Sequence, residues 1–157
     1  MNLHRTILDR LKSHPVEIRR FTDGLTDEQL RKRPSEGKWS LHEITMHICD
    51  GQDVFVERVA RMLTEDKPKF ATFQPDEARQ HGHHLTEDFK KRLKEFEVQR
   101  NTFASLLQTL NESQWKLGGI HPEMKKYTIE KAAESLMRHE ESHLYQMCNV
   151  FFGIQDQ

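Results

Sequence analysis

The chain has 157 residues, of which 31% are charged, and its 24 lysines and arginines nearly balance its 25 aspartates and glutamates. This length fits one domain over residues 1–157, whose core needs neither disulfides nor a structural metal. The near-neutral charge argues against nucleic acid or an anionic membrane as the main partner, and no apolar run approaches the roughly 20 residues of a membrane span. We therefore expect a cytoplasmic protein in which Cys49 and Cys148 are free thiols.

Apolar residues recur at three- and four-residue steps along most of the chain, as they do on one face of a helix. This spacing predicts four amphipathic helices and one short helical turn, over residues 3–22, 26–30 (the turn), 41–63, 87–110 and 129–154. Pro15 is expected to kink or break the first helix. Ser40 and Glu43 form a capping box before the second, Thr86 or a nearby residue is the expected cap of the third, and Thr128 is that of the fourth. Nothing in the pattern predicts a strand.

The four predicted helices each carry one apolar stripe. Such helices bury their stripes together as a four-helix bundle, so the sequence predicts an all-α fold. Prolines, Gly82 and mixed polarity mark residues 67–84 as a long connection. A connection of that length permits a crossover between distant ends of the bundle.

Three histidines are candidate metal ligands. His139 and His143 are four residues apart on the last predicted helix, so they lie about 40° apart on one side of it and can ligate one ion. His47 flanks the stripe of the second helix, and Gly51, one turn later, leaves room for a ligand. Three neutral imidazoles with an open position are typical of a catalytic divalent metal. From the residues alone, hydrogen-bonded core histidines are an equally good interpretation.

Glu140 and Arg100 are candidate catalytic residues with three possible roles. Glu140 lies near the centre of its helix stripe, where a bare carboxylate is costly, and Arg100 interrupts the stripe of the third helix. The two side chains can form a buried pair that fixes helix register. Alternatively, Glu140 is a base for water at the metal, or Arg100 anchors a substrate carboxylate. The sequence leaves these interpretations open.

Other polar residues are expected to play no part in the site. We expect His42 to be on the surface, Asp50 to be solvated and His121 to be a turn residue before Pro122. A further histidine cluster lies in the long connection and is expected to be a polar loop with incidental metal affinity: His81, His83 and His84.

Several short motifs occur in a characteristic order along the chain: Lys38-Trp39-Ser40-Leu41-His42-Glu43-Ile44, His47-Ile48-Cys49-Asp50, Arg100, His121-Pro122 and His139-x-x-x-His143-Leu144. Together they resemble the DinB-like family. The resemblance implies an antiparallel four-helix bundle of up-down-down-up topology, usually a homodimer. It also implies that His47, His139 and His143 bind nickel, zinc or another divalent ion. Relatives of known activity include thiol-dependent transferases and isomerases and some hydrolases.

These observations lead to one enzymatic hypothesis and one alternative. In the first, a divalent metal on the three histidines activates a low-molecular-weight thiol, which attacks an electrophilic small-molecule substrate. If water takes the place of the thiol, Glu140 would be the base and the reaction would be hydrolysis. The alternative is a non-catalytic metal-binding or stress-response protein, in which a fourth protein ligand closes the site.

Overall fold

The computed structural model describes residues 2–73 and 83–155, and its main elements are four long helices. They lie where the apolar spacing predicts them: α1 Leu3–Thr22, α3 Leu41–Thr64, α6 Phe89–Thr109 and α8 Ile129–Gln155. α1 continues through Pro15, so a break at that position is wrong. The expected short turn is confirmed as α2, Asp27–Arg31.

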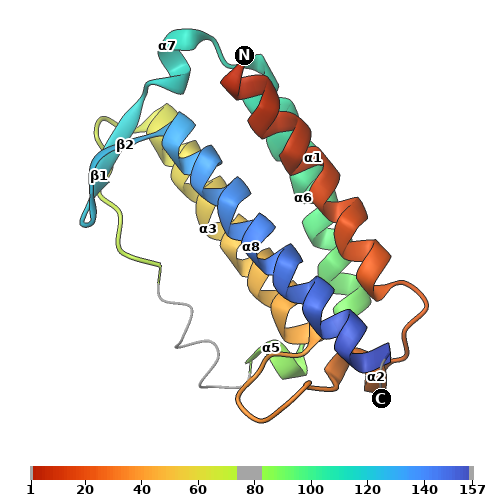
Figure 1. The fold of residues 1–157 in the computed structure, drawn as a ribbon. Helices are drawn as coiled ribbons and strands as arrows, with labels where there is room; N and C mark the ends of the chain where they lie inside the picture. The colour runs from red at the N-terminus through yellow and green to blue at the C-terminus, as the bar shows by residue number, and fades with distance from the viewer. Residues whose placement is uncertain (1, 74–82, 156–157) are drawn as a thin grey trace.

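The long helices form an antiparallel bundle. Figure 1 shows α1 and α8 running in one direction and α3 and α6 running in the other. α8 contacts α1 and α3, and α6 contacts the same two helices. In chain order the helices run up, down, down and up, which confirms the expected four-helix bundle. Because α3 and α6 are parallel, the chain between them must travel the length of the bundle, which explains the long connection.

Polar side chains fix where the helices begin. At α3, Ser40 Oγ accepts a hydrogen bond from the Glu43 amide (3.2 Å), and the Glu43 carboxylate accepts one from the Ser40 amide (2.9 Å). This confirms the expected capping box, and Thr128 caps α8 as expected. The cap of α6 is near Thr86 but is not Thr86 itself, because the side chain of Asp88 accepts the hydrogen bond from the first turn.

The Glu43 carboxylate is buried, and Arg33 also binds it. Burial alone would raise the pKa of Glu43, but hydrogen bonds from Arg33 and Ser40 outweigh it and hold the pKa below its usual range. The ionised carboxylate therefore stabilises the fold above about pH 4.3, and this stabilisation is lost as the pH falls further.

Glu43→Gln tests this contribution, because glutamine keeps the capping hydrogen bond and removes only the charge. We expect the free energy of unfolding in urea to fall by about 1 kcal/mol at pH 7. At about pH 3.5 the loss should be smaller, because Glu43 in the unfolded wild-type chain is then largely protonated and part of its stabilising effect is lost. Equal losses at the two pH values would contradict the assigned pKa direction.

A β-hairpin precedes α8, so the expectation of no strand is wrong. It follows a short helix, and the elements are α7 Glu112–Trp115, β1 Gly118–His121 and β2 Met124–Thr128. The two strands pair antiparallel, but neither shows a regular alternation of buried and exposed residues, so periodicity cannot detect them. Gly119 lets the segment at Pro68 pack closely against β1, because a Cβ at residue 119 would lie 2.5 Å from the Pro68 carbonyl oxygen.

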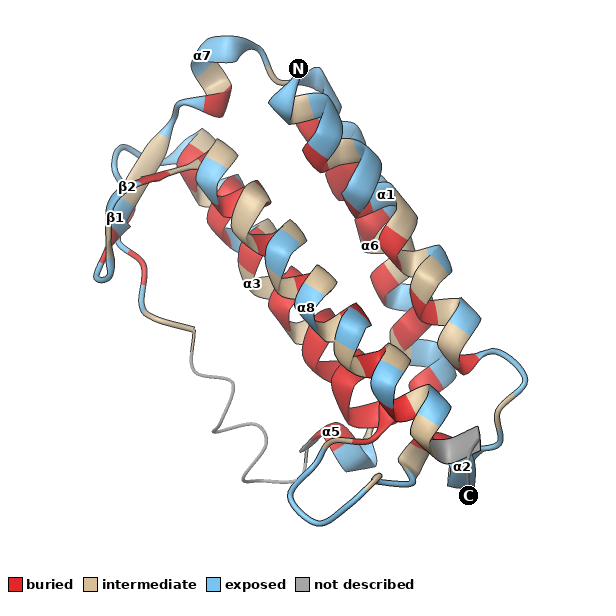
Figure 2. Ribbon diagram, in the orientation of Figure 1, coloured by how far each residue is buried: buried red, intermediate tan, exposed pale blue. Residues whose placement is uncertain are grey.

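The bundle core consists of two apolar clusters with one polar layer between them. The first cluster includes Leu11, Phe55, Phe103 and Leu136, and the second includes Ile18, Ile48, Phe96 and Leu144. Between them, each long helix contributes one buried polar residue to what we call the polar layer: His14, Gln52, Arg100 and Glu140. Figure 2 shows the buried residues on the helix faces that are turned toward one another. No helix in the described ranges is long and apolar enough to cross a membrane.

Candidate metal centre

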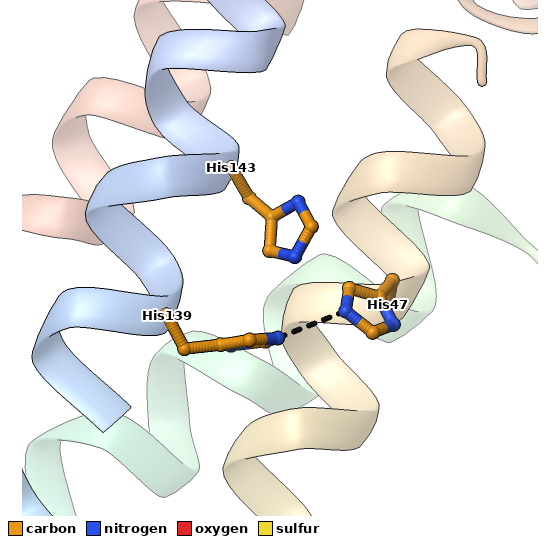
Figure 3. Close-up of side chains that lie close together, drawn as sticks. All are labelled: His47, His139 and His143. Carbon is orange, nitrogen blue, oxygen red and sulfur yellow. Dashed lines mark hydrogen bonds between the residues drawn. The ribbon is translucent and has the colours of Figure 1, made fainter. Parts of the chain in front are cut away.

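Three histidine side chains from two helices converge on one another (Figure 3). His47 projects from α3, and His139 and His143 project from successive turns of α8. The Nε2 atoms of His47 and His139 are 2.8 Å apart, and one nitrogen from each of the three rings lies within 4.8 Å of the others. Among the described residues, this is the one group of histidine, cysteine and acidic side chains close enough to hold an ion.

The surroundings keep all three imidazoles neutral. Burial, together with the neighbouring His143, lowers the pKa of His47 to about 3 and the pKa of His139 to about 4. Burial also lowers the pKa of His143. Neutral imidazole has a free lone pair, which is the form in which histidine ligates a metal. The donor set therefore fits a divalent ion such as zinc or nickel.

The Nδ1 atom of His143 has a hydrogen-bond partner, whereas the Nδ1 atoms of His47 and His139 have none among the described residues. His143 Nδ1 lies 2.9 Å from Gln146 Oε1, so Nδ1 donates this hydrogen bond and Nε2 keeps its lone pair. His47 Nδ1 and His139 Nδ1 are buried and have no hydrogen-bond partner among the described residues. Buried polar atoms without partners are rare in native proteins, and their concentration here is typical of a functional site.

Aromatic rings enclose the imidazoles. The ring centroid of Trp39 is 4.9 Å from that of His47 and 6.0 Å from that of His143. The Phe73 centroid lies 5.9 Å from that of His47 and 6.5 Å from that of His139. These rings shield part of the imidazole surface from water, and apolar walls with few polar groups are typical of small-molecule sites.

Two polar residues near the imidazoles are not where the sequence pattern predicts them. His42 is fully buried, with its ring against Phe89, and is not on the surface. Asp50 is not simply solvated, because its carboxylate lies 2.8 Å from Nε2 of His84. Asp50 has this partner because α5, His83–Thr86, folds against α3, and His42 is buried because Phe89 of α6 packs against its ring.

The same contact corrects the prediction for the histidine cluster of the long connection. His84 is buried, with 3% of its surface exposed, and is therefore not part of a polar loop. His81 and the side chain of His83 lie outside the described part of the chain. His121 lies next to the hairpin turn, as expected, and its Nδ1 accepts a hydrogen bond from the Glu123 amide (3.2 Å).

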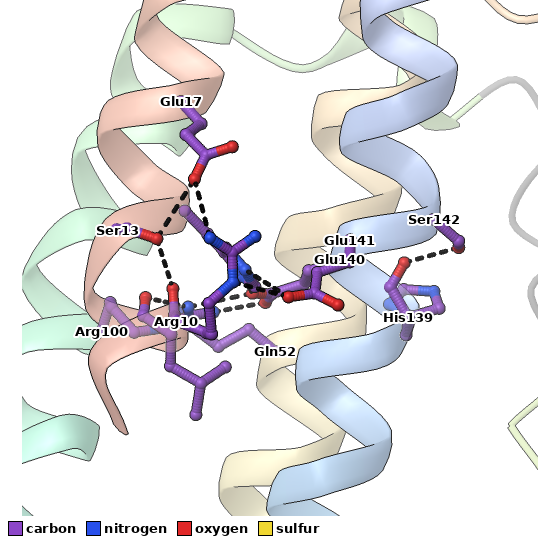
Figure 4. A network of polar contacts seen from close by, with 11 residues as sticks. Arg10, Ser13, Glu17, Gln52, Arg100, His139, Glu140, Glu141 and Ser142 are labelled. Carbon is purple, nitrogen blue, oxygen red and sulfur yellow. Dashed lines mark hydrogen bonds and ion pairs between the residues drawn. The ribbon is translucent and has the colours of Figure 1, made fainter. Parts of the chain in front are cut away.

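Glu140 points away from the imidazoles and into the polar layer (Figure 4). The Arg100 guanidinium binds both of its oxygens, with Nη1 3.0 Å from Oε2, and His14 Nδ1 lies 2.6 Å from Oε2. Arg100 also donates to Gln52 Oε1 (2.6 Å) and to the Leu11 carbonyl (2.7 Å). Because these contacts are inside the bundle, the geometry favours the buried pair that fixes helix register over either catalytic role.

Sequence reasoning missed two members of the polar layer. His14 lies on the apolar stripe of α1, three residues after Leu11, and Gln52 lies on that of α3, four residues after Ile48. Their helical spacing therefore carried a signal of burial. A buried polar side chain requires a partner, so two more polar residues at core positions would have pointed to a network around Glu140.

Comparison with known proteins agrees with this architecture. YfiT of Bacillus subtilis is 24% identical over 135 residues, which cover 85% of this chain and 76% of YfiT. OB0413 of Oceanobacillus iheyensis is 25% identical over 138 residues, which cover 87% of this chain and 79% of that protein. Both carry a provisional name as metal-dependent hydrolases. YuaE of Bacillus subtilis, which has no named function, is 27% identical over 139 residues, which cover 81% of this chain and 86% of YuaE.

The fold is also that of a solved structure. YfiT from Bacillus subtilis, described as a probable metal-dependent hydrolase with an unusual four-helix bundle topology, superposes with a TM-score of 0.83 at 22% identity. The alignment covers 94% of this chain and 85% of YfiT. Residues 10–147 match the DinB superfamily, in agreement with the resemblance that the short motifs carry. The chain therefore belongs to the DinB superfamily.

Proposed function

We propose that the chain is a divalent-metal-dependent enzyme in which His47, His139 and His143 hold one ion, nickel or zinc. The observation that carries this proposal is the convergence of three neutral, largely buried imidazoles. Among the described residues no fourth histidine, cysteine or acidic side chain joins them, and three protein ligands are typical of catalytic sites. A fourth protein ligand would favour the non-catalytic alternative. We also propose that the protein is cytoplasmic, as the sequence pattern led us to expect, and, on the resemblance alone, that it is a homodimer.

The residues of the chain divide the work at this site. A bound ion would supply Lewis acidity toward an electrophilic small molecule. The three imidazoles would hold it, and the rings of Trp39 and Phe73 shield the position from water. The polar layer holds α3 and α8 in register, so that the imidazoles converge.

Two nucleophiles are consistent with this site. Deprotonation of water requires a stronger base than deprotonation of a thiol, because the pKa of a thiol is only about 8.5. Arg100 and His14 already bind Glu140, which was the expected base for water. This favours transfer to a low-molecular-weight thiol. The provisional names of YfiT and OB0413 favour hydrolysis, which is the second candidate.

A paired assay with added nickel or zinc tests the proposal and separates the candidates. Conjugation of cysteine with 1-chloro-2,4-dinitrobenzene reports thiol transfer, and release of nitrophenol from p-nitrophenyl acetate reports hydrolysis. We expect the metal-loaded protein to accelerate the first reaction more than the second. Chelation should abolish the acceleration and leave the helical circular dichroism unchanged, because the apolar clusters do not include the imidazoles. Acceleration that survives chelation would contradict a metal-dependent reaction, and unfolding on chelation would indicate a structural metal.

A further inference from the structure

Gly51 lies directly against the ring of His139. It occupies α3, one turn after His47, and α3 packs against α8. A Cβ atom at this position would lie 2.9 Å from Cε1 and 3.3 Å from Nδ1 of the His139 ring. Carbon atoms do not normally approach so closely, so the imidazole occupies the space that any side chain at residue 51 would need.

The backbone of α3 does not itself require glycine at this position. The glycines with positive φ among the described residues are Gly24 and Gly37, and Gly51 is helical. Glycine inside a helix is less favourable than alanine, because it loses more backbone entropy on folding. What Gly51 supplies is therefore space, and the group that uses this space is the His139 ring.

The helices cannot make room for a side chain by separating freely. Gln52 is the neighbour of Gly51, and Glu140 is the neighbour of His139. Arg100 donates hydrogen bonds to both of these neighbours, so α3 and α8 are tied together at this level through α6. A methyl group at residue 51 would therefore displace the ring, which is the end of a flexible side chain, more readily than the backbone.

We propose that Gly51 is a positioning residue of the metal site, whose lack of a side chain sets the His139 ring beside His47. This inference rests on the proposed function. The ring that Gly51 admits has its Nε2 2.8 Å from Nε2 of His47. A ring displaced by a methyl group would no longer share one ion with the other two, although the fold would remain intact.

Gly51→Ala tests this inference, with Gly153→Ala as the matched control. Gly153 lies inside a helix as Gly51 does, but in α8, and a Cβ there would meet nothing within 4 Å. We expect both variants to unfold at or above the wild-type temperature, because alanine favours helix. Only Gly51→Ala should bind zinc about tenfold to a hundredfold more weakly, measured by competition with a chelating dye. It should also change the visible absorption spectrum of the cobalt-substituted protein, which reports ligand geometry.

A double-mutant cycle gives a second test that needs no metal. In the His139→Ala background, Gly51→Ala should raise the unfolding temperature more than it does in wild type, because the ring no longer competes with the methyl group. Wild-type zinc affinity and an unchanged cobalt spectrum in Gly51→Ala would overturn the inference and leave the proposed function standing. A wild-type chain that binds neither ion would overturn both.

Discussion

His143→Ala is expected to abolish stable loading of one divalent ion per chain. Loss of a hydrogen-bond partner behind a ligand can weaken metal binding by roughly a hundredfold, so removal of one of the three ligands should weaken it more. The variant should keep its helical circular dichroism, because His143 lies outside both apolar clusters. Elemental analysis after dialysis, with calorimetric titration of zinc, measures the effect.

His4→Ala is a suitable control for that experiment. His4 lies at the start of α1, where its Nε2 contacts Glu130 at 2.7 Å and its ring stacks on Trp115. It is therefore a partly buried histidine with its own partners, outside the imidazole group. The control should bind zinc as wild type does. Unchanged loading in His143→Ala would contradict the assignment of the three histidines.

Arg100→Met should be the most destabilising single change in the bundle core. It would leave the Glu140 carboxylate buried, with 0% of its surface exposed, and without its guanidinium partner. Breaking a buried ion pair in this way costs about 3–5 kcal/mol. We expect a loss of this size in the free energy of unfolding measured by urea denaturation.

Two further variants make this prediction specific. The double variant Arg100→Met with Glu140→Leu should be more stable than Arg100→Met alone, because no unpaired charge remains. Arg19→Met removes a pair with Glu97 in which the arginine is 41% exposed, and it should cost at most about 1 kcal/mol. An Arg100→Met variant with wild-type stability but no turnover would contradict the structural role and support the substrate-anchor interpretation.

The long helices could be predicted from the sequence because their signals are local. The capping box of Ser40 and Glu43 and the cap at Thr128 depend on residues within one turn, and the structure confirms both. The apolar stripes give the helix count, and four such stripes leave few architectures other than a bundle. Family membership follows from short motifs whose order, more than any single motif, is characteristic.

Features that depend on contacts between distant residues could not be predicted in the same way. His84 binds Asp50 across 34 positions, and His42 is buried against Phe89, which belongs to another helix. Propensity and periodicity contain no information about such pairs. The hairpin was missed for a related reason, since its strands are short and join a distant segment at Phe70.

The candidate site falls between these two cases. The four-residue spacing of His139 and His143 fixes their common face, but it does not say which helix they meet. The position of His47 beside the stripe of the second helix made it a candidate, the resemblance supported it, and the structure brings all three rings together. For Glu140, the sequence indicated a buried partner but not that its contacts would turn it away from the imidazoles.

The central claim is that three imidazoles from two helices hold one metal ion. A crystal structure of the metal-loaded protein, with anomalous scattering recorded at the absorption edge of the added ion, tests it most directly. We predict one anomalous peak per chain, with the ion about 2.0–2.1 Å from Nε2 of His47, His139 and His143. A peak bound by other residues, or one that leaves His47 out of the coordination sphere, would contradict the claim.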